Sequence, residues 1–211
     1  MEPVQQVAVQ HLGELNMADK ETLANFICWA MDNYPAEKYL LVFSNHGLVW
    51  EIDEGEYDDW ESSHTKQGGS RDNTNGKLYL SNRAIQEAID LAPSDIAIVG
   101  FDACDMNMLE VLYQLRNTGT KVFIGSQNTE DYWGWDYVTL LSALQTRQSD
   151  ITEQEIGSIV CNTFMDNNER YAPFCNSTQA AIDIGKIESL SNNISSLADA
   201  MRLSQNDKGK V

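Results

Sequence analysis

The chain has 211 residues, enough for one well-buried domain, and we expect a single domain over residues 1–211. Fourteen Lys and Arg against 32 Asp and Glu give a formal net charge of −18, which argues against binding to nucleic acid or to an anionic membrane surface. No apolar run reaches the roughly 18 residues of a membrane span, and no secretory signal segment opens the chain. The missing signal says little about secretion, because an upstream segment could have been removed with it.

Helical and strand-like apolar patterns alternate along the chain. The predicted helices cover residues 20–34, 81–91, 107–116, 137–144, 151–164 and 187–201, and the predicted strands cover 39–44, 96–101, 121–126 and 178–184. Asp19 is the expected N-cap of the first helix, and Pro35 is its stop. Helices between short apolar strands favour an α/β domain with a largely parallel sheet and helices on both faces.

A long loop over residues 48–77 interrupts this alternation. Its first part carries seven carboxylates between residues 51 and 61, and its second part is rich in glycine and asparagine. It can be a solvated insertion, a calcium site or a protease-sensitive activation loop. A helix-loop-helix calcium pattern fails here, because with Gly76 as its glycine the first ligand would be Arg71 and the last Asn82.

Only one of the four cysteines occupies a position suited to chemistry. Cys28 and Cys161 lie on apolar helix faces, where a buried and unreactive thiol is the expected state. Cys175 lies in a polar loop. No C-x-x-C pair occurs and the three histidines are scattered, so the sequence predicts no zinc site and requires no metal. Cys104 directly follows a buried strand.

His46 and Cys104 each follow a predicted buried strand, and chemistry in a parallel sheet lies outside the carboxyl ends of its strands. An imidazole and a thiol placed there form a base and a nucleophile. We expect the helix starting near Asn107 to lower the pKa of the Cys104 thiol, so that His46 has only to give a proton to the leaving amine. The N–H groups of Gly47 and Cys104 are the expected oxyanion donors.

Charge near the thiol suggests a substrate preference. Asp102 lies two residues before Cys104, so on an extended chain both side chains point to the same side of the sheet. A carboxylate disfavours a thiolate, but it suits the recognition of a cationic side chain at P1, the residue before the cleaved bond. Asp131 and Asp136, after the following strand, are weaker candidates for the same pocket. Trp133 and Trp135 can line its wall or pack in the core.

Three segments together resemble the clostripain family of cysteine peptidases. They are residues 15–50, including YLLVFSNHGLVW over 39–50, residues 100–111 (GFDACDMNMLEV) and residues 125–137 (GSQNTEDYWGWDY). The resemblance implies a caspase-like fold, an endopeptidase that cuts after Arg in preference to Lys, and a catalytic dyad of His46 and Cys104. It also implies a secreted bacterial enzyme, activation by internal cleavage and, for some members, dependence on calcium.

The family has a strand–helix–strand segment before the region that matches, and residues 4–9 resemble only its last strand. The sheet would then expose a long edge, which a missing segment or a partner chain must cover. Two alternatives remain open at this stage: the same dyad with Asn or Asp specificity, and a silent caspase-like binding module. For an enzyme that cuts after basic residues, Lys66 and Arg71 in the long loop are the expected self-processing sites.

Overall fold

The structure is a computed structural model that describes residues 9–47, 72, 74–75, 78–147 and 150–208. Its centre is a four-stranded sheet in the order β1-β2-β3-β4, formed by Leu40–Ser44, Ile98–Asp102, Val122–Gly125 and Ala180–Asp183. β1, β2 and β3 run parallel, and β4 joins β3 antiparallel. The predicted α/β fold with a mostly parallel sheet is therefore confirmed.

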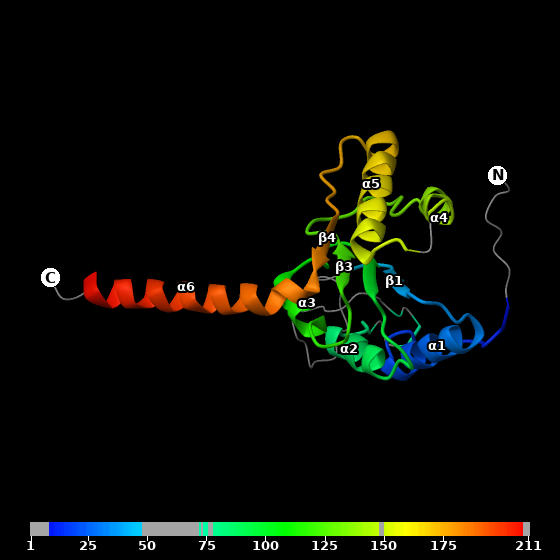
Figure 1. Cartoon of the computed structure of the whole chain (residues 1–211), viewed down its shortest axis with the longest axis horizontal. Helices are drawn as coiled ribbons and strands as arrows, with labels where there is room; N and C mark the ends of the chain where they lie inside the picture. Colours follow the sequence, from blue (N-terminus) through cyan, green and yellow to red (C-terminus); the bar gives the residue numbers. More distant parts are fainter. Residues whose placement is uncertain (1–8, 48–71, 73, 76–77, 148–149, 209–211) are drawn as a thin grey trace.

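Helices cover both faces of this sheet (Figure 1). On one side lie α1 (Lys20–Asn33), α2 (Asn82–Asp90) and α3 (Leu109–Leu115), and on the other α4 (Tyr137–Gln145) and α5 (Glu153–Tyr171). The short helix η1 (Ile184–Lys186) leads from β4 into α6 (Ile187–Lys208). None of the helices in the described part of the chain has the length and apolar content needed to cross a bilayer.

The two-residue period of the strands separates two cores. Phe43, Phe101 and Phe123 point toward α1, α2 and α3, and their rings stack across β1, β2 and β3 with centroids 4.8 and 5.5 Å apart. Ile98 and Ile124 belong to the opposite core, under α4 and α5. The α4/α5 side of the sheet also carries the even-numbered strand residues Ser44, Gly100 and Asp102, because the even-numbered Ile98 points to that side.

Local capping explains where several helices begin. The Asp19 carboxylate accepts the N–H of Glu21, as expected, and the Ser81 hydroxyl accepts that of Ala84 at the start of α2. α5 begins with a capping box between Thr152 and Glu155, and it continues seven residues beyond the predicted end.

Two boundaries differ from the predictions for reasons of tertiary structure. α3 begins at Leu109 instead of residue 107, because Asn107 bonds to the end of β3. Its N–H donates to the Ser126 carbonyl at 2.8 Å and its side-chain amide donates to the Gly125 carbonyl at 3.1 Å. β2 begins at Ile98, two residues later than predicted.

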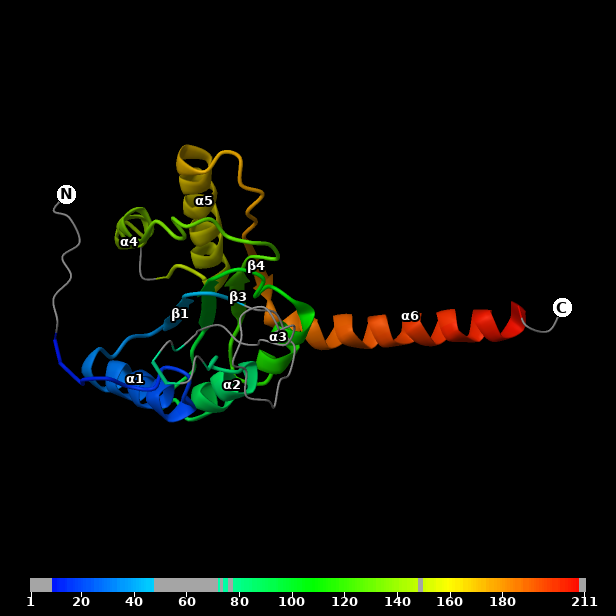
Figure 2. The ribbon, with the colours of Figure 1, turned by 180° about the vertical axis from the view of Figure 1, so that it is seen from behind.

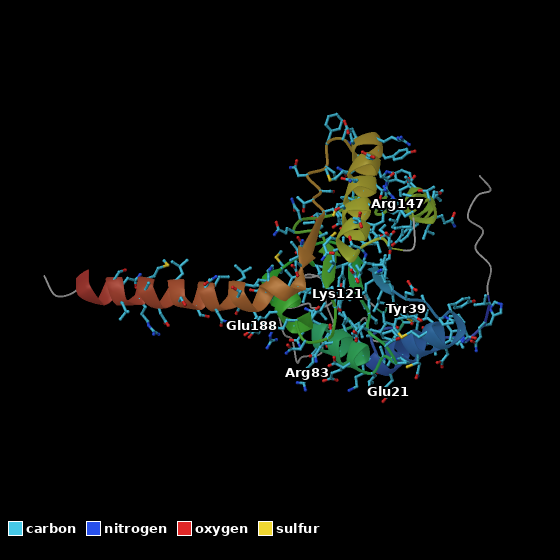
Figure 3. The ribbon with its side chains drawn as sticks, viewed as in Figure 1. Glu21, Tyr39, Arg83, Lys121, Arg147 and Glu188 are labelled. Carbon is cyan, nitrogen blue, oxygen red and sulfur yellow. The ribbon has the colours of Figure 1, made fainter. Side chains whose placement is uncertain are left out.

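α6 leaves the body of the molecule after its first turn and extends away from the sheet (Figures 1 and 2). Glu188, labelled in Figure 3, lies where α6 leaves the body and pairs with Arg116 at 2.9 Å. Five apolar residues recur at helical spacing along α6: Ile187 is buried at 2 % exposure, whereas Leu190, Ile194, Leu197 and Met201 are exposed.

The stacked phenylalanines give a test of the core. We expect Phe101→Ala to lower the free energy of unfolding by about 3–5 kcal/mol, because the side chain is fully buried and its loss leaves a cavity between two rings. Phe26→Ala is the control: Phe26 is 54 % exposed on α1, so its loss should cost less than about 1 kcal/mol. Urea unfolding measures both, and equal losses would contradict this account of the core.

Candidate active site

The segment after β1 packs directly on the segment after β2. A Cβ at Gly47 would collide with the carbonyl oxygen of Cys104 and would come within 2.8 Å of the Met106 side chain, so only glycine fits there. The Asn45 N–H also reaches the Asp102 carbonyl, at 3.4 Å. Two strand ends that are 58 residues apart in sequence therefore meet, and they bring the histidine segment against the cysteine segment.

His46 lies on the solvent side of this contact. Its side chain is exposed, and its backbone N–H donates to the Asn45 side chain at 2.6 Å. Gly47, by contrast, is buried against Cys104. The backbone contact thus fixes the turn, while the imidazole remains accessible to a substrate.

Cys104 is half-buried, and its sulfur faces the loop that follows β3. The Glu130 N–H donates to Sγ at 3.3 Å. Burial raises the pKa of the thiol above its usual value, and the carboxyl groups of Asp105 and Glu130 raise it further, against the opposing N–H groups of Glu130 and of Cys104 itself.

This corrects the expectation that a helix end would ionise the thiol. α3 begins only at Leu109, is seven residues long and has no side-chain cap, whereas the sulfur lies in a partly buried site among carboxyl groups. Desolvation outweighs the helix dipole here, because the dipole acts mainly within the first turn of a helix.

Asp102, the last residue of β2, connects three segments. Its Oδ2 accepts the Tyr137 hydroxyl at 2.8 Å and the Ser44 hydroxyl at 3.3 Å, and its Oδ1 accepts the Trp135 N–H at 3.0 Å. Gly134 approaches so closely that a Cβ there would lie 2.5 Å from Oδ1. Burial raises the pKa of Tyr137, and the negative charge of Asp102 raises it further. Asp102 therefore holds the loop after β3 against the ends of β1 and β2.

The other aromatic and acidic residues of this loop have separate roles. Trp135 is 4 % exposed and packs in the core, with its ring against Gly100, whereas Trp133 is 60 % exposed. Asp136 caps α4 by accepting the Thr139 N–H and hydroxyl. Asp131 is half-buried and accepts the Trp133 N–H, so part of its carboxylate serves the loop turn.

Sequence analysis missed Glu130, whose backbone N–H contacts the Cys104 sulfur and whose carboxyl group lies beside Asp102. Its side chain is 8 % exposed, and burial together with the neighbouring Asp102 charge raises its pKa to about 9. Ser44 and Tyr137 were missed as well. Their positions in the sequence could have indicated a role at the site: Ser44 ends β1, and Glu130 and Tyr137 lie in the 125–137 motif.

Several predicted features fall on residues whose structure is not described, among them Lys66, Arg71 and most of the 48–77 loop. Of the loop, Asp72 is described: it is buried, and it accepts the N–H groups of Met17, Thr74 and Asn75, which lower its pKa. Its oxygens thus face donors, which does not suit a cation. Among the described residues, no group of three or more His, Cys, Asp or Glu side chains is placed to hold a metal ion.

Comparison with known proteins identifies the class to which this fold and site belong. The pattern of the clostripain family, peptidase family C11, matches residues 2–211, and the chain belongs to this family of cysteine peptidases. Clostripain from Hathewaya histolytica is 32% identical over 123 residues, a match that covers 49% of this chain and 19% of clostripain.

Solved structures agree on the fold. A secreted C11 cysteine protease from Bacteroides thetaiotaomicron in complex with an irreversible peptide inhibitor has a TM-score of 0.66 at 23% identity, covering 83% of this chain and 47% of that one. An inactive zymogen C11 protease from Parabacteroides distasonis has a TM-score of 0.61 at 21% identity, covering 90% and 45%. The chain therefore spans about half the length of these relatives.

Proposed function

We propose that the chain is the part of a clostripain-type cysteine endopeptidase that carries the catalytic dyad, His46 and Cys104, and that the enzyme cleaves peptide bonds after Arg or Lys. The observation that carries the proposal is the backbone contact between Gly47 and Cys104, because it brings an imidazole-bearing turn against a thiol-bearing turn at the carboxyl end of a parallel sheet. Membership of the clostripain family supports it.

The raised pKa of Cys104 gives His46 two proton transfers during acylation instead of one. Because the thiol is neutral in the free enzyme, the imidazole takes its proton as the sulfur attacks the substrate carbonyl. It then gives that proton to the leaving amine, and an acyl-enzyme forms. Water, deprotonated by the same imidazole, attacks the thioester and releases the acid and the free thiol.

The oxyanion that develops during attack needs donors near the sulfur. The N–H groups of Gly47 and Cys104 are the proposed donors. The absence of a side chain on Gly47 supports this assignment, because it allows the backbone of the turn to approach the nucleophile closely.

Asp102 is the residue proposed to bind the cationic P1 side chain, and Asp131 is proposed to contribute less. Asp102 is half-buried at the end of β2 and lies beside Glu130, whose backbone contacts the sulfur. Its carboxylate is already bonded to Ser44, Trp135 and Tyr137, which holds it in a fixed orientation before substrate binds.

The proposed substrates are peptides and proteins with a basic P1 residue, and the secreted Bacteroides relative supports action outside a bacterial cell. A segment outside the described residues, or a partner chain, would pair with the edge of β1, which in the described sheet pairs only with β2. Calcium dependence stays a prediction from the family resemblance.

The dyad is tested by single substitutions. We expect Cys104→Ala to abolish hydrolysis of a fluorogenic Arg peptide while leaving the unfolding curve unchanged, because only the nucleophile is removed. His46→Ala should be nearly as severe. Cys161→Ala is the matched control, since that half-buried thiol lies on α5 and packs against the core beneath it, and the specific activity of this variant should stay close to wild type. Turnover by the Cys104 variant would refute the dyad.

A panel of peptides differing only at P1 separates the proposed specificity from the alternatives. Arg and Lys peptides should be cleaved, and Asp and Asn peptides should not. Cleavage after Asn or Asp alone would show that the enzyme prefers these residues at P1 instead of Arg and Lys. No cleavage of any peptide would favour a silent binding module.

Asp102→Asn should lower kcat/KM for Arg peptides on the order of 100-fold, because losing one partner of a buried charge pair costs about 2–5 kcal/mol. The fold should persist, since an Asn oxygen can still accept the Trp135 N–H while the hydroxyls of Ser44 and Tyr137 turn to accept from its amide. Asp136→Asn is the control, because Asn caps a helix as well as Asp. Unchanged Arg cleavage by the Asp102 variant would move the role to Asp131.

Self-processing is expected after Lys66 or Arg71. Wild type should produce fragments ending at these residues, identified by intact-mass spectrometry, and Cys104→Ala should not. The double variant Lys66→Gln, Arg71→Gln keeps the nucleophile and should also stay whole. Equal fragment yields in wild type and Cys104→Ala would show that another protease makes the cut.

A further inference from the structure

Glu130 is a buried carboxyl group that has no well-formed hydrogen bond to any described residue. Its side chain is 8 % exposed, yet neither carboxyl oxygen makes a hydrogen bond of good geometry within the described part of the chain. The amide of Gln179, just before β4, is its polar neighbour and is itself buried without a well-formed hydrogen bond there. Buried polar groups in this state are rare in folded proteins and call for an explanation.

The charges around Glu130 are negative. Burial raises its pKa most, and two carboxyl groups raise it further: Asp102 faces it from β2, and Asp131 follows it in the chain. The ionisable thiol of Cys104 and the hydroxyl of Tyr137 also lie within its electrostatic reach. Two adjacent carboxyl groups in a desolvated site cannot both ionise without a cation, so in the free enzyme Glu130 keeps its proton while Asp102 is charged.

Asp102 alone has little capacity left for a guanidinium. A carboxylate offers about four acceptor positions, and three of those on Asp102 are used by Ser44, Trp135 and Tyr137. A guanidinium binds best through two parallel hydrogen bonds, which requires two free positions. Glu130 lies beside Asp102, and neither of its oxygens makes a hydrogen bond of good geometry, so once it has lost its proton it can supply the acceptors that Asp102 lacks.

We propose that Glu130 is a second carboxyl group of the P1 site, uncharged in the free enzyme, which releases its proton to solvent when a cationic P1 side chain binds beside Asp102. This inference rests on the proposed preference for basic P1 residues. The proton balance is simple: Glu130 passes from acid to carboxylate, one proton enters the solvent, and the bound guanidinium keeps its own charge throughout.

A pH dependence follows from this proton release. Binding that releases a proton strengthens as pH rises, up to the pKa of Glu130 in the free enzyme, about 9. Below that value the association constant for an Arg peptide should rise up to tenfold per pH unit. A peptide with citrulline at P1, the uncharged isostere of arginine, should lack this dependence.

Titration calorimetry on Cys104→Ala tests the proposal without turnover. An Arg peptide and its citrulline counterpart are titrated at pH 7.5 in phosphate and in Tris, whose ionisation enthalpies differ, so that the number of released protons is measured. We expect close to one proton for the Arg peptide and close to none for citrulline. In Cys104→Ala combined with Glu130→Gln, the Arg peptide should release close to none and bind at least tenfold more weakly.

Glu130→Gln should fold normally, because a neutral amide replaces a neutral acid of nearly the same shape and the backbone N–H to Cys104 is retained. Glu169→Gln, which removes an exposed carboxylate on α5, is the control for overall charge and should release the same proton as its parent. Arg binding without proton release, in the chain that keeps Glu130, would overturn the inference while leaving the proposed specificity standing. Cleavage confined to non-basic P1 residues would overturn both.

Discussion

The hydrogen bonds that converge on the Asp102 carboxylate organise this site. One oxygen holds the Trp135 N–H, and the other holds the hydroxyls of Tyr137 and Ser44, so the end of β1 and the loop after β3 are tied to the end of β2. That loop in turn carries Glu130, whose N–H contacts the Cys104 sulfur. A carboxylate that accepts several hydrogen bonds fixes the neighbours that donate to it. The Asp102 carboxylate therefore both holds the neighbouring segments in place and supplies negative charge at the site.

Burial beside these carboxyl groups also shapes the chemistry. The pKa values of the Cys104 thiol and of the Glu130 carboxyl group are both raised, which favours the protonated form of each group. A cationic substrate side chain would change this balance, because it supplies the positive charge that the described surroundings lack. In this account the substrate completes the electrostatics of the site, which links P1 recognition to the protonation state around the nucleophile.

Two surfaces of the described chain have no packing partner within it. β1 pairs with β2 alone, and the apolar face of α6 beyond Ile187 is exposed where the helix extends from the body. The solved relatives are about twice as long as this chain. The contact between α5 and β4, by contrast, is closely packed: a Cβ added at Gly157 of α5 would lie 2.8 Å from the Cβ of Ala181 on β4.

The sequence by itself determined the elements and the two strand ends that matter. Apolar periodicity placed the four strands and six α-helices of the described residues, since alternation and helical spacing are local properties, and His46, Gly47, Asp102 and Cys104 followed from their positions after buried strands. Only the tertiary structure decided that α3 starts late, that α6 leaves the sheet, that Trp135 is core and Trp133 is not, and that Glu130 lies buried beside Asp102. These depend on contacts between residues distant in the chain, as does the raised pKa of Cys104, because desolvation is set by what packs around a group and not by its neighbours in sequence.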